Sequence, residues 1–339
     1  MGRLSDSLKR FAIAAAVACV GLFVQPAQAH DYWLSPAVVV SRGPVTVPVS
    51  LFVGEGLVPE EEKAHQATRA VLLQHWFAGG SEDLLPRAVE GAKPAFSFSA
   101  KAPGGHLIVL ERNAAHIEMA APKFEAYLLE EGLASIVQER KRRGETDKPA
   151  RERYTRYLKA LVQVGDQRDE AYRAGPKQAL TIDPGENPVF IASGGTLEVV
   201  VLFRGEPLAG ATLEALSRDG ERVTKQVLVT DANGVGHVAL EGAGVRLLRM
   251  VHMIHCDDCK GADWESFWAS YLFGTKPADG GELTLPALAA AVSKPPTSDA
   301  GTVPPKSGGC GCEVARDTSS ASRWALCVAF VALVLLRRK

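Results

Sequence analysis

The stretch that decides the fold is TLEVVVLFRGEPLAGATLEALSRDGERVTKQVLVTDANGVGHVAL, residues 196–240. It alternates short apolar runs with turn residues at a spacing of about ten, which is typical of antiparallel strands. Asn233-Gly234 lies between two alternating runs and is a strong hairpin signal. Such short, regularly spaced strands favour a β-sandwich. The strands are expected at residues 196–203, 211–216, 224–229 and 237–240.

The segments before this stretch predict more strands and a pair of helices. Short β-type runs, broken by Gly and Pro, occur at residues 38–40, 46–53, 75–77, 96–99 and 107–110. The pattern changes at Pro122, which suits a first helical turn, and apolar residues then recur at helical spacing. A second helix is expected over residues 154–162, where Tyr154, Tyr157 and Leu158 begin an apolar stripe. The sequence therefore predicts a helical hairpin near residues 122–165.

Two turns, GEPLAGA at 205–211 and TDANGV at 230–235, resemble those of immunoglobulin-like carboxypeptidase-regulatory and transthyretin-like modules. The resemblance implies immunoglobulin- or transthyretin-like β-sandwich regions. With the helical spacing described above, the sequence predicts a mainly β fold with an inserted α-helical hairpin. The expected organisation has five parts. They are a signal peptide at 1–29, an N-terminal β-rich domain at 30–179, a β-sandwich domain at 180–275, a flexible stalk at 276–309 and a sorting tail at 310–339.

The N-terminal residues predict export. A basic start with Arg3, Lys9 and Arg10 precedes an apolar run, and Ala27-Gln28-Ala29 is a small-x-small cleavage site. Cleavage after Ala29 makes His30 the first residue of the mature chain. The net charge of −1 gives no global field that would favour nucleic acid as a partner.

The C-terminal residues predict surface retention. Gly308-Gly309-Cys310-Gly311-Cys312 precedes a polar spacer, an apolar run over 324–336 and the basic end Arg337-Arg338-Lys339. This tail resembles C-terminal sorting domains of the MYXO-CTERM type. The resemblance implies processing by a sorting machinery, contact with the membrane through the tail, and retention at the cell envelope through Cys310 and Cys312.

Four motifs in order resemble an exported family often labelled a periplasmic component of cobalt or nickel transport. They are HDYWLSP at 30–36, FEAYLLEEGL at 124–133, RERYTRYLK at 151–159 and DWESFWAS at 263–270. The resemblance implies a metal-uptake transporter as a partner. It carries over no catalytic residues.

The new N-terminus is the first candidate metal site. An α-amine with a pKa of about 7.7–8.0 beside an imidazole of about 6.5 can chelate one ion through His30. One more imidazole gives an all-nitrogen ligand set that suits copper(II) or nickel(II), and His252 is the predicted partner. The family resemblance adds cobalt as a further possible ion. The alternatives are that His30 caps the first strand and that His252 is a structural histidine of a sheet.

The second candidate is the loop His255-Cys256-Asp257-Asp258-Cys259. His255 with the thiolates of Cys256 and Cys259 suits copper(I) or zinc. In an oxidising compartment the same Cys-x-x-Cys favours a small disulfide loop, because no second such pair completes four ligands.

An enzyme is the less favoured class. The sequence has no His-Glu-x-x-His, no Gly-x-Ser-x-Gly, no phosphate-binding glycine loop and no dinucleotide fingerprint. We therefore expect an exported, surface-retained protein that binds a transition metal for uptake or sequestration. The alternative is a metal-free β-sandwich module for surface adhesion or interaction.

Overall fold

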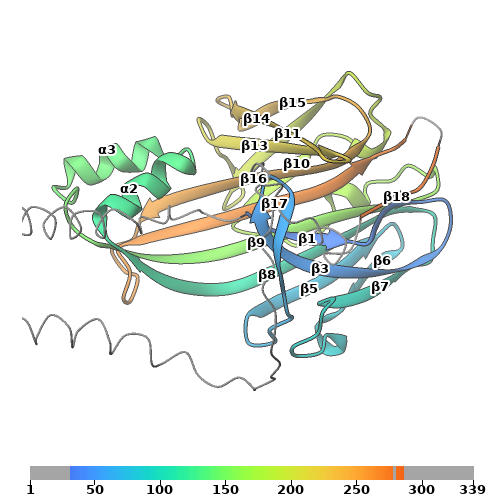
Figure 1. The fold of residues 1–339 in the computed structure, drawn as a ribbon, viewed down its shortest axis with the longest axis horizontal. Helices are drawn as coiled ribbons and strands as arrows, with labels where there is room; N and C mark the ends of the chain where they lie inside the picture. Colours follow the sequence, from blue (N-terminus) through green and yellow to red (C-terminus); the bar gives the residue numbers. More distant parts are fainter. Residues whose placement is uncertain (1–30, 278–279, 286–339) are drawn as a thin grey trace, which may run out of the picture. The chain divides into compact units, whose positions relative to one another are not determined.

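A computed structural model describes residues 31–277 and 280–285, and within them the fold is mainly β. A ten-stranded sheet dominates (Figure 1), and its main path runs β14-β13-β16-β17-β9-β8-β5-β6. Its strands are β2 (Val38–Ser41), β5 (Ala70–Phe77), β6 (Gly80–Asp83), β8 (Gly104–Met119), β9 (Ala150–Val164), β13 (Thr212–Asp219), β14 (Arg222–Val229), β16 (Gly244–His255), β17 (Trp264–Thr275) and β18 (Leu283–Thr284). The predicted mainly β class is confirmed.

Two small sheets pack on the large one. The first contains β1 (Asp31–Pro36), β3 (Val45–Glu55), β4 (Val58–Lys63) and β7 (Phe96–Ala100). The second contains β10 (Leu180–Pro184), β11 (Gly195–Phe203), β12 (Glu206–Pro207) and β15 (Val235–Leu240). Short 3₁₀ turns lie at Leu85–Arg87, Ala171–Arg173 and Pro188–Phe190.

The small sheets bury the two faces of the large sheet in separate cores. Leu158 and Ala160 of β9 point into a first core, with residues of β1, β3 and β7. Tyr157 and Leu161 point into a second core, with residues of β10, β11 and β15. Successive side chains of a strand lie on opposite faces, so a strand covered on both sides is apolar throughout.

Burial on both faces explains one wrong prediction. Residues 154–162 are the middle of strand β9 and do not form the second helix of a hairpin. β9 pairs antiparallel with β8 and parallel with β17, which places it in the interior of the sheet. An apolar run buried on both faces contains helix-like spacings by chance, and periodicity alone cannot separate the two structures.

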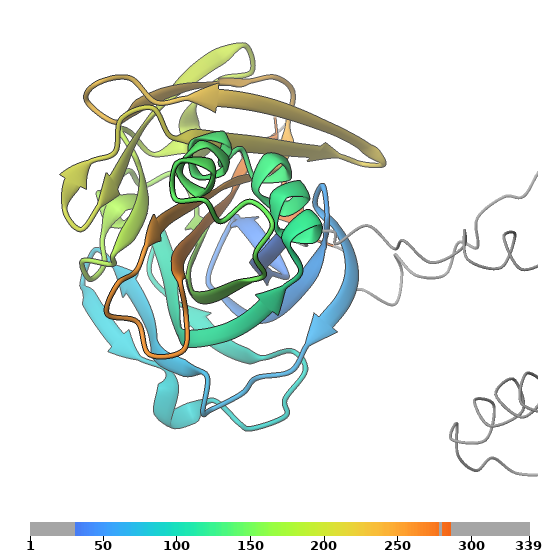
Figure 2. The ribbon, with the colours of Figure 1, turned by 90° about the vertical axis from the view of Figure 1, so that its left-hand side faces the viewer.

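The helical pair is shorter and lies earlier than predicted. Helices α2 (Ala121–Glu130) and α3 (Ala134–Arg142) are joined through Gly132, whose φ of +69° favours glycine. A Cβ atom there would also lie 2.7 Å from the Thr212 side chain. Phe124 and Leu128 pack on Trp264 in a third core. The helices therefore cover one end of β16 and β17 (Figures 1 and 2).

The large sheet crosses the expected domain boundary at residue 179. It takes β5, β6, β8 and β9 from before this point and β13, β14, β16 and β17 from after it. The two expected regions therefore share one sheet. The expected flexible stalk also begins with structure, because β18 pairs with β2. The signal peptide, His30, the rest of the stalk and the tail lie outside the described residues.

A buried ion network centred on Arg249 connects the first small sheet, the end of α2 and the large sheet. Its guanidinium lies 2.8 Å from Asp31 of β1, 3.0 Å from Glu131 after α2 and 2.8 Å from Glu214 of β13. Lys225 of β14 pairs with the other oxygen of Glu214, at 2.5 Å. Three carboxylates thus face two cations. Burial raises the pKa of Glu131 to about 8 against the pull of Arg249, so this carboxyl holds the balancing proton at pH 7.

This proton makes stability depend on pH. The pKa of Glu131 is raised above its unfolded value, so its contribution is present at low pH and lost as pH rises from about 4.5 through 8. Replacing Glu131→Gln keeps the neutral form at every pH. We expect the variant to remove a fall on the order of 3 kcal/mol between pH 5 and 8, measured by urea unfolding. Glu130→Gln, on the exposed neighbour, is the control and should retain the wild-type slope.

Candidate functional site

Two histidines meet at the first-core face of the large sheet. His75 of β5 and His106 of β8 are each only 2% exposed. The antiparallel pairing sets Phe77 opposite His106, so the two histidines are diagonal neighbours. His75 Nε2 lies 2.8 Å from His106 Nδ1. Strand pairing therefore brings together two imidazoles that are 31 residues apart in the chain.

The outer nitrogen of each ring contacts an acceptor. His75 Nδ1 lies 2.9 Å from a carboxylate oxygen of Glu82, and His106 Nε2 lies 2.9 Å from the carbonyl oxygen of Ala102. Oxygen acceptors of this kind fix the proton of a neutral imidazole on the nitrogen that faces them. The inner nitrogens then face each other with two lone pairs and no proton. Such a pair needs a shared proton or a metal ion between its nitrogens.

The pair lies at a cavity of about 260 Å³. Burial lowers the pKa of both His75 and His106, which favours the neutral rings at pH 7. The hydrogen bond with His75 lowers the pKa of Glu82, whose other oxygen pairs with Arg87 at 2.6 Å. The remaining residues that line the cavity are Phe77, Ser99, Lys101 and Ala102.

The predicted partnership of His30 with His252 stays a prediction, because His30 lies outside the described residues. Only the surroundings of His252 are described. Arg249 and His252 are three positions apart on β16 and therefore lie on opposite faces of the sheet. His252 packs edge-on against Phe203, with ring centroids 4.4 Å apart. Burial, with the Arg204 charge, lowers its pKa to about 4.

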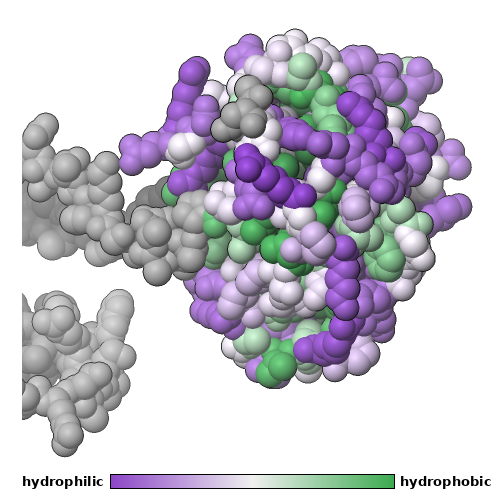
Figure 3. All heavy atoms as spheres, turned by 90° about the vertical axis from the view of Figure 1, so that its right-hand side faces the viewer, coloured by the Kyte–Doolittle hydropathy of each residue, from purple (hydrophilic) through white to green (hydrophobic). Residues whose placement is uncertain are grey.

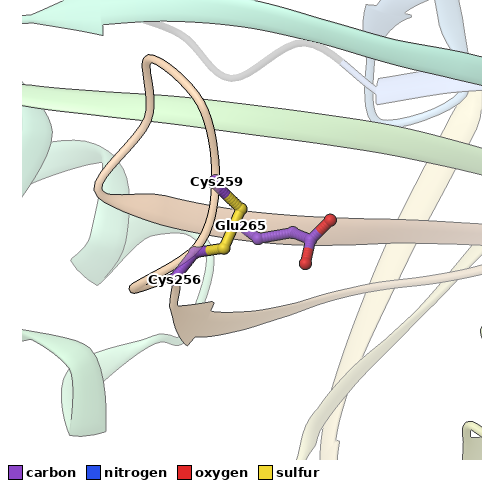
Figure 4. A group of neighbouring side chains, drawn as sticks. All are labelled: Cys256, Cys259 and Glu265. Carbon is purple, nitrogen blue, oxygen red and sulfur yellow. A yellow bond between two sulfur atoms is a disulfide. The ribbon is translucent and has the colours of Figure 1, made fainter.

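The Cys-x-x-Cys loop forms the disulfide alternative. Cys256 and Cys259 are bonded to each other between β16 and β17 (Figure 4), so neither offers a thiolate. The Glu265 carboxylate lies within 4.8 Å of the sulfurs, but it is paired with Arg153. His255 lies edge-on to Trp264 and 3.0 Å from the Asp257 carboxylate. The predicted thiolate site is therefore closed by oxidation.

Several predicted features lie elsewhere in the chain. Ala29, Cys310 and Cys312 lie outside the described residues, as does the apolar run of the tail. Within the part that the structure describes, no helix has the length and apolar character to cross a membrane. No sequence motif links His75 with His106. The missing information was the register between β5 and β8, which no local motif specifies.

Removing the disulfide tests the assignment of the loop. In the Cys256→Ser/Cys259→Ser variant we expect a loss of about 2 kcal/mol in the free energy of unfolding, because a four-residue loop restricts the unfolded chain only slightly. Urea unfolding measures this loss, and transition-metal affinity should not change. A tenfold weaker metal affinity in the variant would instead assign the loop a role in metal binding.

The comparisons place the chain in a family. A model described as "Domain of unknown function (DUF4198)" matches residues 27–254, which is more than half of the chain. No curated protein matches the sequence. The matched region contains His75, Glu82 and His106, whereas the disulfide loop follows its end. The chain therefore belongs to the DUF4198 family.

Proposed function

We propose that this protein is exported, retained at the cell surface, and binds a transition metal ion for uptake or sequestration. The proposal locates the ion at His75 and His106 and no longer at His30 with His252. The observation that carries it is the pair of inner nitrogens 2.8 Å apart, each with an acceptor on its outer nitrogen. Metal-ligating histidines characteristically donate their second N–H to a carboxylate or carbonyl oxygen.

The ligand chemistry favours nickel, cobalt or copper over hard cations. Imidazole nitrogens suit late transition metals, whereas magnesium and calcium prefer several oxygens. With metal–nitrogen bonds of about 2.0–2.1 Å, two nitrogens at right angles around one ion lie about 2.9 Å apart. The observed spacing is close to this value. The rings must tilt to direct both lone pairs at one ion, because their centroids are 5.0 Å apart and their nitrogens point at each other.

The two histidines leave coordination positions free on the side of the cavity, which favours an exchangeable ion. Two side-chain nitrogens leave the other coordination positions to water or to a donor that enters the cavity, whereas structural metal sites are closed by four protein ligands. Arg87 and the exposed Lys101 add positive charge at this cavity and weaken the hold on a divalent cation. Modest affinity suits a carrier that passes the ion to a metal-uptake transporter.

The alternative function is a metal-free module for surface adhesion or interaction. The exposed large apolar side chains of the described residues are Val58, Val71, Val89, Ile117, Leu129, Val227 and Val229. Most belong to different elements, and hydrophilic side chains cover much of the face in Figure 3. A docking surface normally gathers a larger continuous apolar patch. The nitrogen pair is therefore the stronger basis for a function.

Calorimetric titration with copper(II), nickel(II), cobalt(II) and zinc(II) tests the proposal. We expect one ion per chain, with an affinity at least tenfold weaker in His75→Gln and in His106→Gln, because each variant removes one nitrogen ligand. His116→Gln is the matched control, since His116 lies exposed on the same strand β8. It should bind like the wild type.

Two further variants separate the competing sites. Loss of binding in His252→Gln, or on blocking the amine of a chain that begins at His30, would assign the ion to His30 and His252. Wild-type affinity in both His75→Gln and His106→Gln would contradict the proposed site. If the wild-type chain bound no ion, the surface-interaction module would become the better hypothesis.

Export and surface retention are tested by mass spectrometry of the protein isolated from its envelope. We expect a mature chain that begins at His30 and lacks the apolar run 324–336, because both termini carry processing signals. Recovery of peptides that contain Leu336 from the mature protein would contradict processing of the tail.

A further inference from the structure

Three arginines without acidic partners gather on the first-core face of the large sheet. Arg112 of β8 and Arg156 of β9 are directly opposite each other in the antiparallel register. Arg69 lies beside them in the turn before β5, where its carbonyl oxygen accepts a hydrogen bond from the Asn113 amide at 2.8 Å. Like charges directly opposite each other destabilise a sheet. We call Arg69, Arg112 and Arg156 the arginine cluster.

The contacts of the arginine cluster are to neutral groups. Arg112 donates to the Tyr32 hydroxyl and, at 2.6 Å, to the Gln66 side-chain oxygen. Arg69 donates to the Ala114 carbonyl at 3.2 Å. Within residues 31–277 and 280–285, none of the three guanidinium groups forms an ion pair. Their positive charge is therefore not neutralised by an ion pair within the described part of the chain.

Aromatic rings surround Arg156. Its guanidinium carbon lies 4.9 Å from the ring centre of Tyr32, 4.8 Å from that of Tyr154 and 5.2 Å from that of Trp268. Trp268 is its direct neighbour on β17, so the sheet register fixes this arrangement. The rings hold the guanidinium by cation–π attraction, which orients the cation and leaves its charge in place. The buried Nε of Arg156 has no hydrogen-bond partner.

The groups around the arginine cluster favour a bound anion. Burial lowers the pKa of Arg112, and the Arg69 and Arg156 charges lower it further, although arginine stays protonated. Burial raises the pKa of Tyr32, so its hydroxyl keeps a proton to donate. The Arg156 charge acts on Glu152, but that carboxylate accepts hydrogen bonds from Ser266 and Tyr127. A concentration of guanidinium groups without ion pairs matches the oxygens of an anion.

We propose that the arginine cluster, with Tyr32, binds a small oxyanion that carries a phosphate, sulfate or carboxylate group. Guanidinium groups present paired N–H donors that match such oxygens, often in bidentate geometry. Arg156, Arg69 and Tyr32 are each partly exposed, so the anion reaches the cluster from solvent. The bound anion offsets the repulsion between the two opposed arginines. This site is distinct from the histidine pair and does not depend on the metal proposal.

Calorimetric titration of the purified full chain with phosphate, sulfate and citrate tests the proposal, with sodium chloride added to equal ionic strength as the reference. We expect saturable binding of at least one of these anions and a rise in melting temperature that chloride does not reproduce. Preference for phosphate and sulfate, or for citrate, identifies which oxyanion group the cluster selects. Arg156→Gln and Arg69→Gln should each weaken the affinity at least tenfold, because each removes one guanidinium.

Arg151→Gln is the matched control. Arg151 lies on the same strand β9 and loses the same charge, but its guanidinium is paired with Asp263 at 2.6 Å and lies on the opposite face. The Arg151→Gln variant should bind the anion with the same affinity as the wild type. Arg69→Gln guards against a folding defect in Arg156→Gln, since Arg69 is only partly buried and its side chain makes one hydrogen bond to the backbone. No saturable binding by the wild type, or an equal loss in Arg151→Gln, would overturn the proposal.

Discussion

The Arg249 ion network is the constraint on which the arrangement of layers depends. One guanidinium joins the first small sheet through Asp31, the end of α2 through Glu131 and strand β13 through Glu214. A buried charge is tolerated only when it is paired, so neither β1 nor β13 can shift without leaving a charge uncompensated. Displacing the end of α2 would instead break the hydrogen bonds between Glu131 and Arg249. The network therefore sets the position of β1, which in turn brings Tyr32 to Arg112 and Arg156.

Local patterns predicted most of the strands, because several strands of the small sheets alternate buried and exposed side chains and end at turn residues. The Asn233-Gly234 turn does lie just before β15, but the predicted hairpin is wrong. β14 pairs with β13 in the large sheet and β15 pairs with β11 in the second small sheet, so the turn connects two sheets. The same reasoning failed at β9, where burial on both faces removes alternation and leaves spacings that resemble a helix. The disulfide was foreseen as one of two alternatives, because chemistry in an oxidising compartment constrains two nearby cysteines.

Neither candidate site could be read from the sequence, for a shared reason. His75 and His106 meet through the register of β5 and β8, and Arg112 meets Arg156 through that of β8 and β9. Register between strands is set by the whole set of buried side chains and not by any short motif. Both sites lie along the same face of β8, with the first core between them. One strand thus presents neutral nitrogen donors near its beginning and unpaired cations further along.

The parallel pairing of β17 with β9 has a consequence for how the chain assembles. Glu152 of β9 lies opposite Trp264 of β17 in the parallel register, although 112 residues separate them in the chain. In contrast, only α2 and α3 lie between β8 and β9. Closing so long a loop is slow relative to forming local antiparallel pairs. Until residues 264–275 are available to pair, β9 is an apolar edge open to other chains. A chain that stops short of Trp264 is therefore prone to aggregation, however complete its N-terminal strands are.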